Sequence, residues 1–223
     1  GCDSRYTWAK KFKGLMGHET PSVLADKIVD ALKTDSNPEG LFLHPGSKQY
    51  QHLCFTGGEP LMATGQLASM GIYKALKKKN NLPKSMTFET NGTQTLREPF
   101  KQWIKEIPEE IFFSVSPKLF TVSGEKTEKA IKPENVAEYT ECSDRGQLKF
   151  VVGAADREWD EMEMTVEKFR KAGVQWPVWI MPTGAREEEQ VATAGQVAEK
   201  AFKKGYNVAA RVHVYLFGNA IGT

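Results

Sequence analysis

Short apolar runs rich in Val, Ile, Leu and Phe alternate with longer amphipathic segments over most of the chain. Runs of this length bounded by turn residues are typical of buried parallel strands, and the amphipathic segments between them predict the helices of βαβ units. The predicted strands are His52–Thr56, Met86–Thr90, Ile111–Ser116, Leu148–Val152, Val178–Met181 and Val208–Val214. The predicted helices are Val23–Leu32, Leu67–Lys79, Pro99–Ile107, Glu158–Ala172 and Glu187–Lys204.

Two segments between these elements are predicted to be loops. Thr34–Tyr50 carries two prolines and two glycines, and we expect Phe42 and Leu43 within it to turn inward. Ser123–Glu134 is the second loop, and Ser22 is the expected cap of the first helix. Neither loop has the length or monotony of an interdomain linker, and the chain shows no repeat of fixed period, so we expect a single domain over residues 1–223.

The composition is that of a folded globular protein. Hydrophobic residues make up 40% and charged residues 26% of the 223 residues, a length that fits one core. The 30 basic and 28 acidic residues nearly balance, so nothing in the net charge of +2 indicates binding to nucleic acid. No run approaches the roughly 18 apolar residues that span a bilayer, and the first residues lack the layout of a signal peptide. We expect a cytoplasmic protein with no membrane partner.

The three cysteines, Cys2, Cys54 and Cys142, are odd in number and widely separated. A disulfide framework is therefore not expected, and a reducing compartment is. Cys54 and Cys142 have no second cysteine at ligand spacing, which indicates packing or surface thiols.

Polar or glycine-rich motifs end the first three predicted strands: Gly57–Pro60, Glu89–Thr93 and Ser116–Lys118. Ligands of parallel α/β folds gather at the carboxyl ends of strands, whether the sheet curls or stays open. Two glycines allow backbone to approach a ligand, and the glutamate after them offers a carboxylate to an ammonium group. The same glycines also suit a plain strand-to-helix turn, and both interpretations stay open.

The other two motifs have equally ordinary alternatives. Glu89 ends a run that favours burial, so its carboxylate needs a partner, which is either a ligand or a salt bridge. Ser116-Pro117-Lys118 offers a hydroxyl, a stiff proline and a positive charge, but taken alone it is more typical of a surface turn.

The motif Cys2–Trp8, CDSRYTW, resembles the end of the C-x3-C-x2-C loop of radical S-adenosylmethionine (SAM) enzymes. The variant with this continuation is similar to the 7-carboxy-7-deazaguanine synthase family. Five further motifs recur in that family in the same order: TGGEPL at Thr56–Leu61, ETNGT at Glu89–Thr93, SVSPK at Ser114–Lys118, LKFVV at Leu148–Val152 and RVHVYLFGN at Arg211–Asn219. The resemblance implies a partial, incomplete β/α barrel of parallel strands within the α/β class.

The resemblance also implies cofactors. In the family three thiolates bind a 4Fe-4S cluster, and SAM chelates its fourth iron. Carried over, Cys2 is the third cluster ligand, with Gly1 and Asp3 beside SAM. Ser4 stands where the family uses a hydroxyl to hold Mg²⁺, a hard cation that prefers oxygen.

The same carry-over places SAM at the strand ends. Gly58 and Glu59 lie against the methionyl ammonium, while Glu89 and Ser116-Pro117-Lys118 lie near the ribose and carboxylate. Met181-Pro182-Thr183-Gly184 is the loop expected to close over the adenosine.

The implied reaction converts 6-carboxy-5,6,7,8-tetrahydropterin to 7-carboxy-7-deazaguanine with loss of ammonia, a carbon–nitrogen lyase step that feeds queuosine biosynthesis. Mg²⁺ would bridge the substrate carboxylate and orient the ring. Thr56 is expected near the substrate. His213 would contact the pterin or be a core histidine, and Thr223 would present its terminal carboxylate. A flavodoxin or ferredoxin is the expected electron donor, and a homodimer is possible.

The sequence departs from the family at its start, where the first strand and the first two cluster cysteines are missing. Either the sequence begins just past the second cysteine, or it is a homologue that keeps the pocket and has lost the radical chemistry. Two further alternatives are a radical SAM activase of a glycyl-radical partner and a non-catalytic SAM binder.

Overall fold

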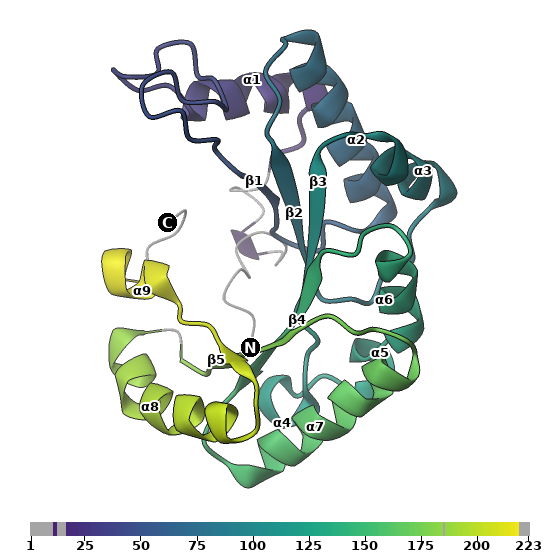
Figure 1. Cartoon of the computed structure of the whole chain (residues 1–223), viewed down its shortest axis with the longest axis vertical. Coiled ribbons are helices and arrows are strands. Elements are labelled where there is room, and N and C mark those ends of the chain that lie inside the picture. Colours follow the sequence, from purple (N-terminus) through teal and green to yellow (C-terminus); the bar gives the residue numbers. More distant parts are fainter. Residues whose placement is uncertain (1–10, 13–16, 185, 219–223) are drawn as a thin grey trace. The chain divides into compact units, whose positions relative to one another are not determined.

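In the computed structural model, which describes residues 11–12, 17–184 and 186–218, strands and helices alternate along the chain (Figure 1). The described strands are β1 (Leu53–Phe55), β2 (Ser85–Thr90), β3 (Glu110–Val115), β4 (Gly146–Val152), β5 (Val178–Pro182) and β6 (Asn207–Val208), and they follow this order in one sheet. The described helices are α1 (Pro21–Ala31), α2 (Ala63–Lys78), α3 (Glu98–Glu106), α4 (Phe120–Ser123), α5 (Thr127–Ala130), α6 (Pro133–Thr140), α7 (Asp156–Lys171), α8 (Glu187–Lys203) and α9 (Val212–Phe217). The predicted α/β class with parallel strands is confirmed, and the open strand order is consistent with an incomplete β/α barrel.

Within the described residues, the chain divides into two compact units. Unit 1 comprises residues 91–93, 114–184 and 186–218, and unit 2 comprises residues 11–12, 17–90 and 94–113.

In unit 2 an aromatic cluster covers one face of the strands. Phe55 of β1 lies opposite Phe88 of β2, and their rings stack with centroids 5.0 Å apart. Phe100 of α3 meets Phe88 edge to face at 5.4 Å, and Phe113 of β3 stacks on it at 5.9 Å. Each contact of this kind adds to the free energy gained by burying the rings, so the cluster fixes α3 on the strands.

The two faces of β2 differ in polarity. Met86 and Phe88 are fully buried, whereas Thr87 is half-buried and Glu89 is exposed. Alternate side chains of a strand point to opposite faces, so Thr87 and Glu89 share the polar face, and the register adds Cys54 of β1 opposite Thr87. Sequence reasoning expected a run that is buried as a whole, and Glu89 is outside the buried part of it.

In unit 1, β5 pairs in parallel with Leu148–Val152 of β4, with Phe150 opposite Ile180. Both of these side chains are fully buried, and Phe169 of α7 meets Phe150 edge to face at 6.5 Å. The helix α7 is therefore held on the same face of β4 that carries its apolar residues.

The end of unit 1 overturns a prediction, because Val208–Val214 is not a strand. β6 stops at Val208 and α9 begins at Val212. Ala209 N–H still donates to Ile180 C=O at 2.8 Å, but the next ladder position on β5 is Pro182. Proline has no N–H, so the parallel ladder has no donor with which to continue.

Other boundaries were predicted in part. Phe42 is buried as expected, but Leu43 is 38% exposed. The cap of α1 is Thr20 and not Ser22, because the Thr20 hydroxyl accepts from Val23 N–H at 3.4 Å. The predicted loop Ser123–Glu134 contains α5 and the start of α6. None of the helices in the described ranges is long and apolar enough to cross a membrane.

Candidate functional site

The turn after β1 combines a strained backbone with open space. Gly57 and Gly58 adopt φ values of 77° and 55°, which L-residues with side chains rarely accept. A Cβ placed on Gly58 would meet no atom within 4 Å. The turn therefore requires glycine for its backbone conformation, and it also leaves room beside Gly58 for a ligand. Both interpretations of the motif fit the structure.

Glu59 has a fixed orientation in this turn. Its Oε1 accepts a hydrogen bond from the Thr90 hydroxyl at 2.6 Å and one from Leu61 N–H at 3.1 Å. The residue is half-buried, whereas Pro60 and Leu61 are buried. Two donors on one oxygen orient the carboxylate, so less conformational entropy is lost when a cation binds.

Thr56 and Glu89 both lie exposed near the carboxyl ends of their strands in unit 2. The prediction that the Glu89 carboxylate would be buried is wrong, because it points to the polar face of β2. An exposed carboxylate keeps most of its hydration, so its desolvation cost is small. Burial therefore does not require an ionic partner for Glu89.

The predicted motif Ser116-Pro117-Lys118 follows β3 and is anchored from α7. Pro117 is buried, and Ser116 and Lys118 are half-buried. In the helical turn that follows, the Glu161 carboxylate accepts from Phe120 N–H and Thr121 N–H, both at 2.8 Å, and from the Thr121 hydroxyl at 2.6 Å.

This anchor replaces a missing cap, because Leu119, the N-cap of α4, makes no side-chain hydrogen bond to the helix. Unsatisfied N–H groups at a helix start need an acceptor, and here a neighbouring helix supplies it. Glu161 therefore holds the segment that carries the predicted motif.

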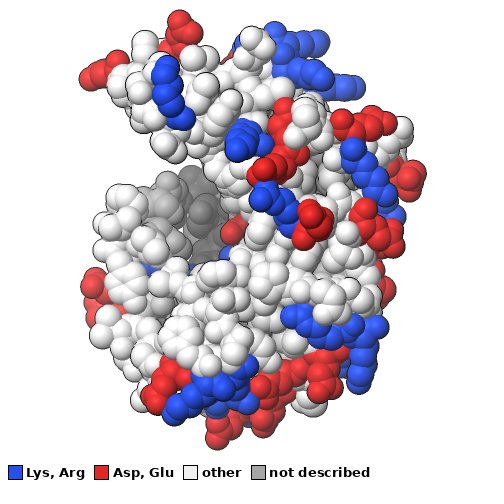
Figure 2. Space-filling view, in the orientation of Figure 1, with Lys and Arg blue, Asp and Glu red and all other residues white. Residues whose placement is uncertain are grey.

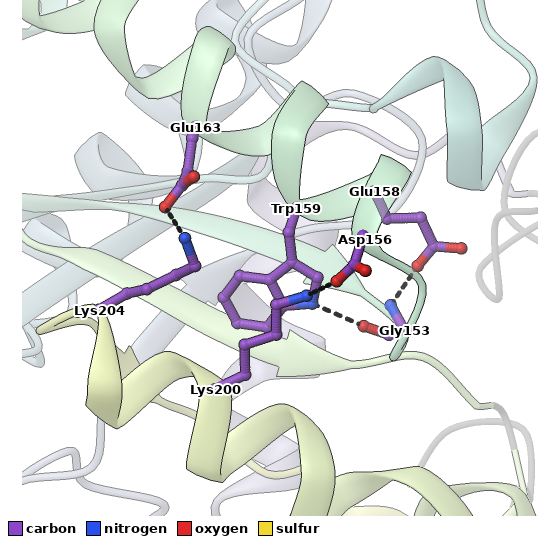
Figure 3. Close-up of polar contacts among 7 residues, drawn as sticks. All are labelled: Gly153, Asp156, Glu158, Trp159, Glu163, Lys200 and Lys204. Carbon is purple, nitrogen blue, oxygen red and sulfur yellow. Dashed lines mark hydrogen bonds and ion pairs between the residues drawn. The ribbon is translucent and has the colours of Figure 1, made fainter.

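At the carboxyl end of β4, the peptide groups of Gly153 are held from two sides (Figure 3). Its N–H donates to Glu158 Oε2 at 2.5 Å, and its C=O accepts from Trp159 Nε1 at 3.0 Å. A Cβ on Gly153 would lie 2.8 Å from the Glu158 carboxylate and 3.1 Å from the Thr183 hydroxyl. A side chain at this position would therefore have to displace the ends of the Glu158 and Thr183 side chains.

The helices α7 and α8 are joined beside this point. Lys200 of α8 pairs with Asp156, and its ammonium lies 5.1 Å from the centre of the Trp159 ring. Lys204 pairs with Glu163 at 2.7 Å. Bonding to Lys200 lowers the pKa of the exposed Asp156 carboxyl. Figure 2 shows acidic and basic side chains interleaved over these helices.

The loop predicted to close over the adenosine starts two residues later in the structure than the sequence predicted. Met181 and Pro182 belong to β5, and only Thr183 and Gly184 follow the strand. Gly184 has φ of 132°, and its C=O accepts from Gln190 Nε2 at 2.7 Å.

The structure does not describe several of the predicted site residues. Gly1, Cys2, Asp3, Ser4 and Thr223 lie outside the described residues. His213 lies in α9 and not in a strand, and the structure describes its backbone alone.

The described residues bring no metal-ligand cluster together. Within the described ranges, no three His, Cys, Asp or Glu side chains are grouped so as to hold a metal ion. Cys54 is exposed on β1 in unit 2, and Cys142 is half-buried after α6 in unit 1. Their assignment as packing or surface thiols agrees with these positions.

Three buried amides that sequence reasoning missed hold strand-end segments. Gln66 binds the segments after β1 and β2, and Gln190 binds the one after β5. Asn135 of α6 donates to Thr93 C=O at 2.8 Å. A polar residue on the buried stripe of an amphipathic helix is the signal that would have found them.

Comparison with known proteins finds a distant relative in sequence and a shared fold. No protein-family model matches the chain. The 7-carboxy-7-deazaguanine synthase of Rhodopirellula baltica is 26% identical over 183 residues, which cover 78% of this chain and 64% of that protein. The chain thus spans less than two thirds of the length of this relative. The crystal structure of Streptococcus suis SuiB bound to precursor peptide SuiA matches over 95% of this chain and 46% of that one, with TM-score 0.55 and 9% identity, and so shares its fold. The chain is therefore a distant homologue of 7-carboxy-7-deazaguanine synthase, in agreement with the resemblance that its motifs carry.

Proposed function

We propose that this protein is a radical SAM enzyme that converts 6-carboxy-5,6,7,8-tetrahydropterin to 7-carboxy-7-deazaguanine with loss of ammonia. The observation that carries the proposal is the homology to the Rhodopirellula baltica synthase, which extends over 78% of the chain. The strand-end motifs that resemble those of the synthase family support the same proposal.

The turn after β1 fits the amino-acid part of SAM. Glu59 presents a carboxylate that Thr90 and Leu61 hold in one orientation, and the space beside Gly58 is open. A carboxylate attracts the methionyl ammonium, and the open backbone at Gly58 allows close approach. These residues would bind and orient SAM.

The 4Fe-4S cluster does not fit the described residues. The resemblance to radical SAM enzymes implies such a cluster, which supplies the electron that cleaves SAM in these enzymes. The cysteines of the described ranges, Cys54 and Cys142, provide no set of three thiolates. Attachment of the cluster through Cys2 therefore stays a prediction. The same holds for Mg²⁺ at Ser4.

The remaining assignments belong to the same proposal. Thr56, exposed after β1, would contact the pterin. A flavodoxin or ferredoxin would supply the electron, and the product would enter queuosine biosynthesis. Glu89 on the polar face of β2 would contact the polar groups of SAM, and the contacts expected of Ser116-Pro117-Lys118 stay predictions.

The test uses protein made from the full reading frame and reconstituted with iron and sulfide under anaerobic conditions. Incubation with SAM, a reductant and the pterin should yield 7-carboxy-7-deazaguanine, detected by mass spectrometry, together with ammonia. Cys2→Ala should abolish product, because it removes the predicted cluster ligand. Cys142→Ala should retain product formation, because Cys142 is not a predicted cluster ligand. The described ranges bring no metal-ligand group together around it.

The outcomes separate the competing functions. Cleavage of SAM to 5′-deoxyadenosine without the deazaguanine product would contradict this substrate and favour another radical SAM reaction. SAM binding without cluster loading would contradict the enzyme reading and favour a non-catalytic SAM-binding homologue.

A further inference from the structure

The amide of Gln66 joins two segments that follow neighbouring strands of unit 2. Its Nε2 donates to Leu61 C=O at 2.6 Å and to Thr95 C=O at 2.9 Å, and its Oε1 accepts from Arg97 N–H at 2.9 Å. Leu61 ends the turn after β1, while Thr95 and Arg97 precede α3. The side chain is 2% exposed, so water does not compete for these bonds.

A purely structural filler would not need an amide at this position. A Leu or Met of similar volume would fill the same space but would leave the Leu61 and Thr95 carbonyls and the Arg97 N–H without this partner. The amide instead uses both of its donors and its acceptor on backbone groups. Both segments that it holds lie next to the strand ends that carry the proposed SAM contacts.

Leu61 links this amide to Glu59. The N–H of Leu61 donates to Glu59 Oε1 at 3.1 Å, and its C=O accepts from Gln66 at 2.6 Å. Leu61 thus bonds Glu59 through its N–H and Gln66 through its C=O, so the bond from Gln66 helps to hold the backbone that orients the Glu59 carboxylate. Thr90, at the end of β2, donates to the same carboxylate oxygen at 2.6 Å.

The first turn of α2 is shaped to hold this arrangement. A Cβ on Gly65 would lie 2.2 Å from the Pro60 carbonyl oxygen, so the turn packs directly on the helix backbone. Gln66 N–H donates to Met62 C=O at 2.9 Å, which fixes the start of its side chain. The turn after β1 is thus packed against the first turn of α2, from which the Gln66 side chain extends.

We propose that Gln66 is a positioning residue for SAM, which sets the Glu59 carboxylate through Leu61 and couples the turn after β1 to the segment before α3. This inference rests on the proposed function, because it takes the amino-acid group of SAM to be the ligand of Glu59. Gln66 itself does not contact the ligand.

The experiment measures binding of S-adenosylhomocysteine, which has the amino-acid and adenosine groups of SAM, by titration calorimetry at pH 8 and pH 6. Gln66→Glu keeps the size of the side chain and loses both donors, so its affinity at pH 8 should fall at least tenfold. At pH 6 a protonated carboxyl regains one donor, and part of the affinity should return. Gln66→Met should lose affinity to a similar degree at both pH values. Gln102→Met, at an exposed amide of α3 that bonds Glu106, should bind as the wild type does.

A second measurement uses the wild type and does not depend on how the variants fold. In hydrogen exchange, saturating S-adenosylhomocysteine should slow exchange in residues 57–62 and in residues 94–98 together. Protection confined to residues 57–62 would overturn the coupling. Equal affinity of wild type and Gln66→Glu, or recovery at pH 6 by Gln66→Met as well, would overturn the positioning role. Absence of binding by the wild type would instead overturn the proposed function, and the inference with it.

Discussion

At the scale of single residues, His52 shows how a histidine can be fully engaged without a catalytic role. Its Nδ1 lies 2.8 Å from the Ser85 hydroxyl, and its Nε2 lies 2.7 Å from the Thr87 hydroxyl. Both hydroxyls belong to β2, so the ring bridges the chain before β1 to the neighbouring strand. Burial lowers the pKa of the imidazole, because removing it from water disfavours its charged form.

This lowered pKa predicts a loss of stability on acidification. The unfolded chain takes up the proton first, near pH 6.5, so stability is complete above that pH. It falls as the pH drops through the unfolded pKa towards the lower folded pKa. The free energy of unfolding, measured in urea from pH 8 to pH 5, should therefore fall more for the wild type than for His52→Gln. His44→Gln keeps His52 and should follow the wild type. Parallel curves for the wild type and His52→Gln would show that the pKa of His52 is not lowered.

In a second serine–histidine contact, the histidine does not activate the serine as a nucleophile. His44 Nε2 lies 3.1 Å from Ser36 Oγ, a geometry that would suit a base and its serine. However, Nδ1 accepts from the N–H groups of Gly46 and Ser47, both at 3.1 Å. The ring proton is therefore on Nε2, where it donates to the serine and does not accept from it.

At the scale of elements, sequence patterns located the buried strands β2 and β4 better than they located the start of α2. The predicted strands Met86–Thr90 and Leu148–Val152 lie within β2 and β4, because short buried apolar runs bounded by turns are typical of strands. The start of α2 was placed at Leu67, four residues after its true start at Ala63. The missed residues include Gly65, which a sequence pattern marks as a helix breaker and which the structure needs beside the Pro60 carbonyl.

The same error hid part of the candidate site. With the helix placed at Leu67, Gln66 falls outside it, and nothing marks the residue as buried. The turn at Gly57–Pro60 was predictable, because its residue types directly specify a backbone conformation. Long-range anchors such as Gln66 and Glu161 depend on which elements pack together, and local sequence does not contain that information.

The anchoring of α4 by α7 predicts a difference between two glutamates of one helix. Glu161→Gln places an amide donor against N–H donors, so the free energy of unfolding should fall by about 1–2 kcal/mol, the usual cost of a lost cap or buried hydrogen bond. Glu163→Gln, two residues further along, removes only a surface pair with Lys204 and should have no measurable effect. Urea denaturation of both variants checks this. Equal losses would show that Glu161 acts through general charge on α7 and not through the start of α4.

At the scale of the whole molecule, three buried amides from three helices repeat one arrangement. Gln66, Asn135 and Gln190 each lie on a helix and donate to backbone carbonyls of segments that follow strands. Each side-chain N–H donor finds a carbonyl acceptor in this way, so each amide ties the conformation of its segment to the packing of its helix. The strand-end segments are therefore rigid in advance of any ligand, which lowers the entropy lost on binding.

Rigid strand ends that bind SAM should make the whole chain more stable in the presence of a SAM analogue. A ligand that binds only the folded state at 100 times its Kd contributes about 2.7 kcal/mol. For a chain of 223 residues this corresponds to a rise in Tm of about 5–10 °C. Scanning calorimetry with S-adenosylhomocysteine measures the rise. Glu59→Gln should reduce it, because the neutral amide no longer attracts the ammonium, whereas Glu106→Gln on the exposed surface of α3 should not. A Tm that stays fixed as the analogue rises to millimolar concentrations would contradict SAM binding.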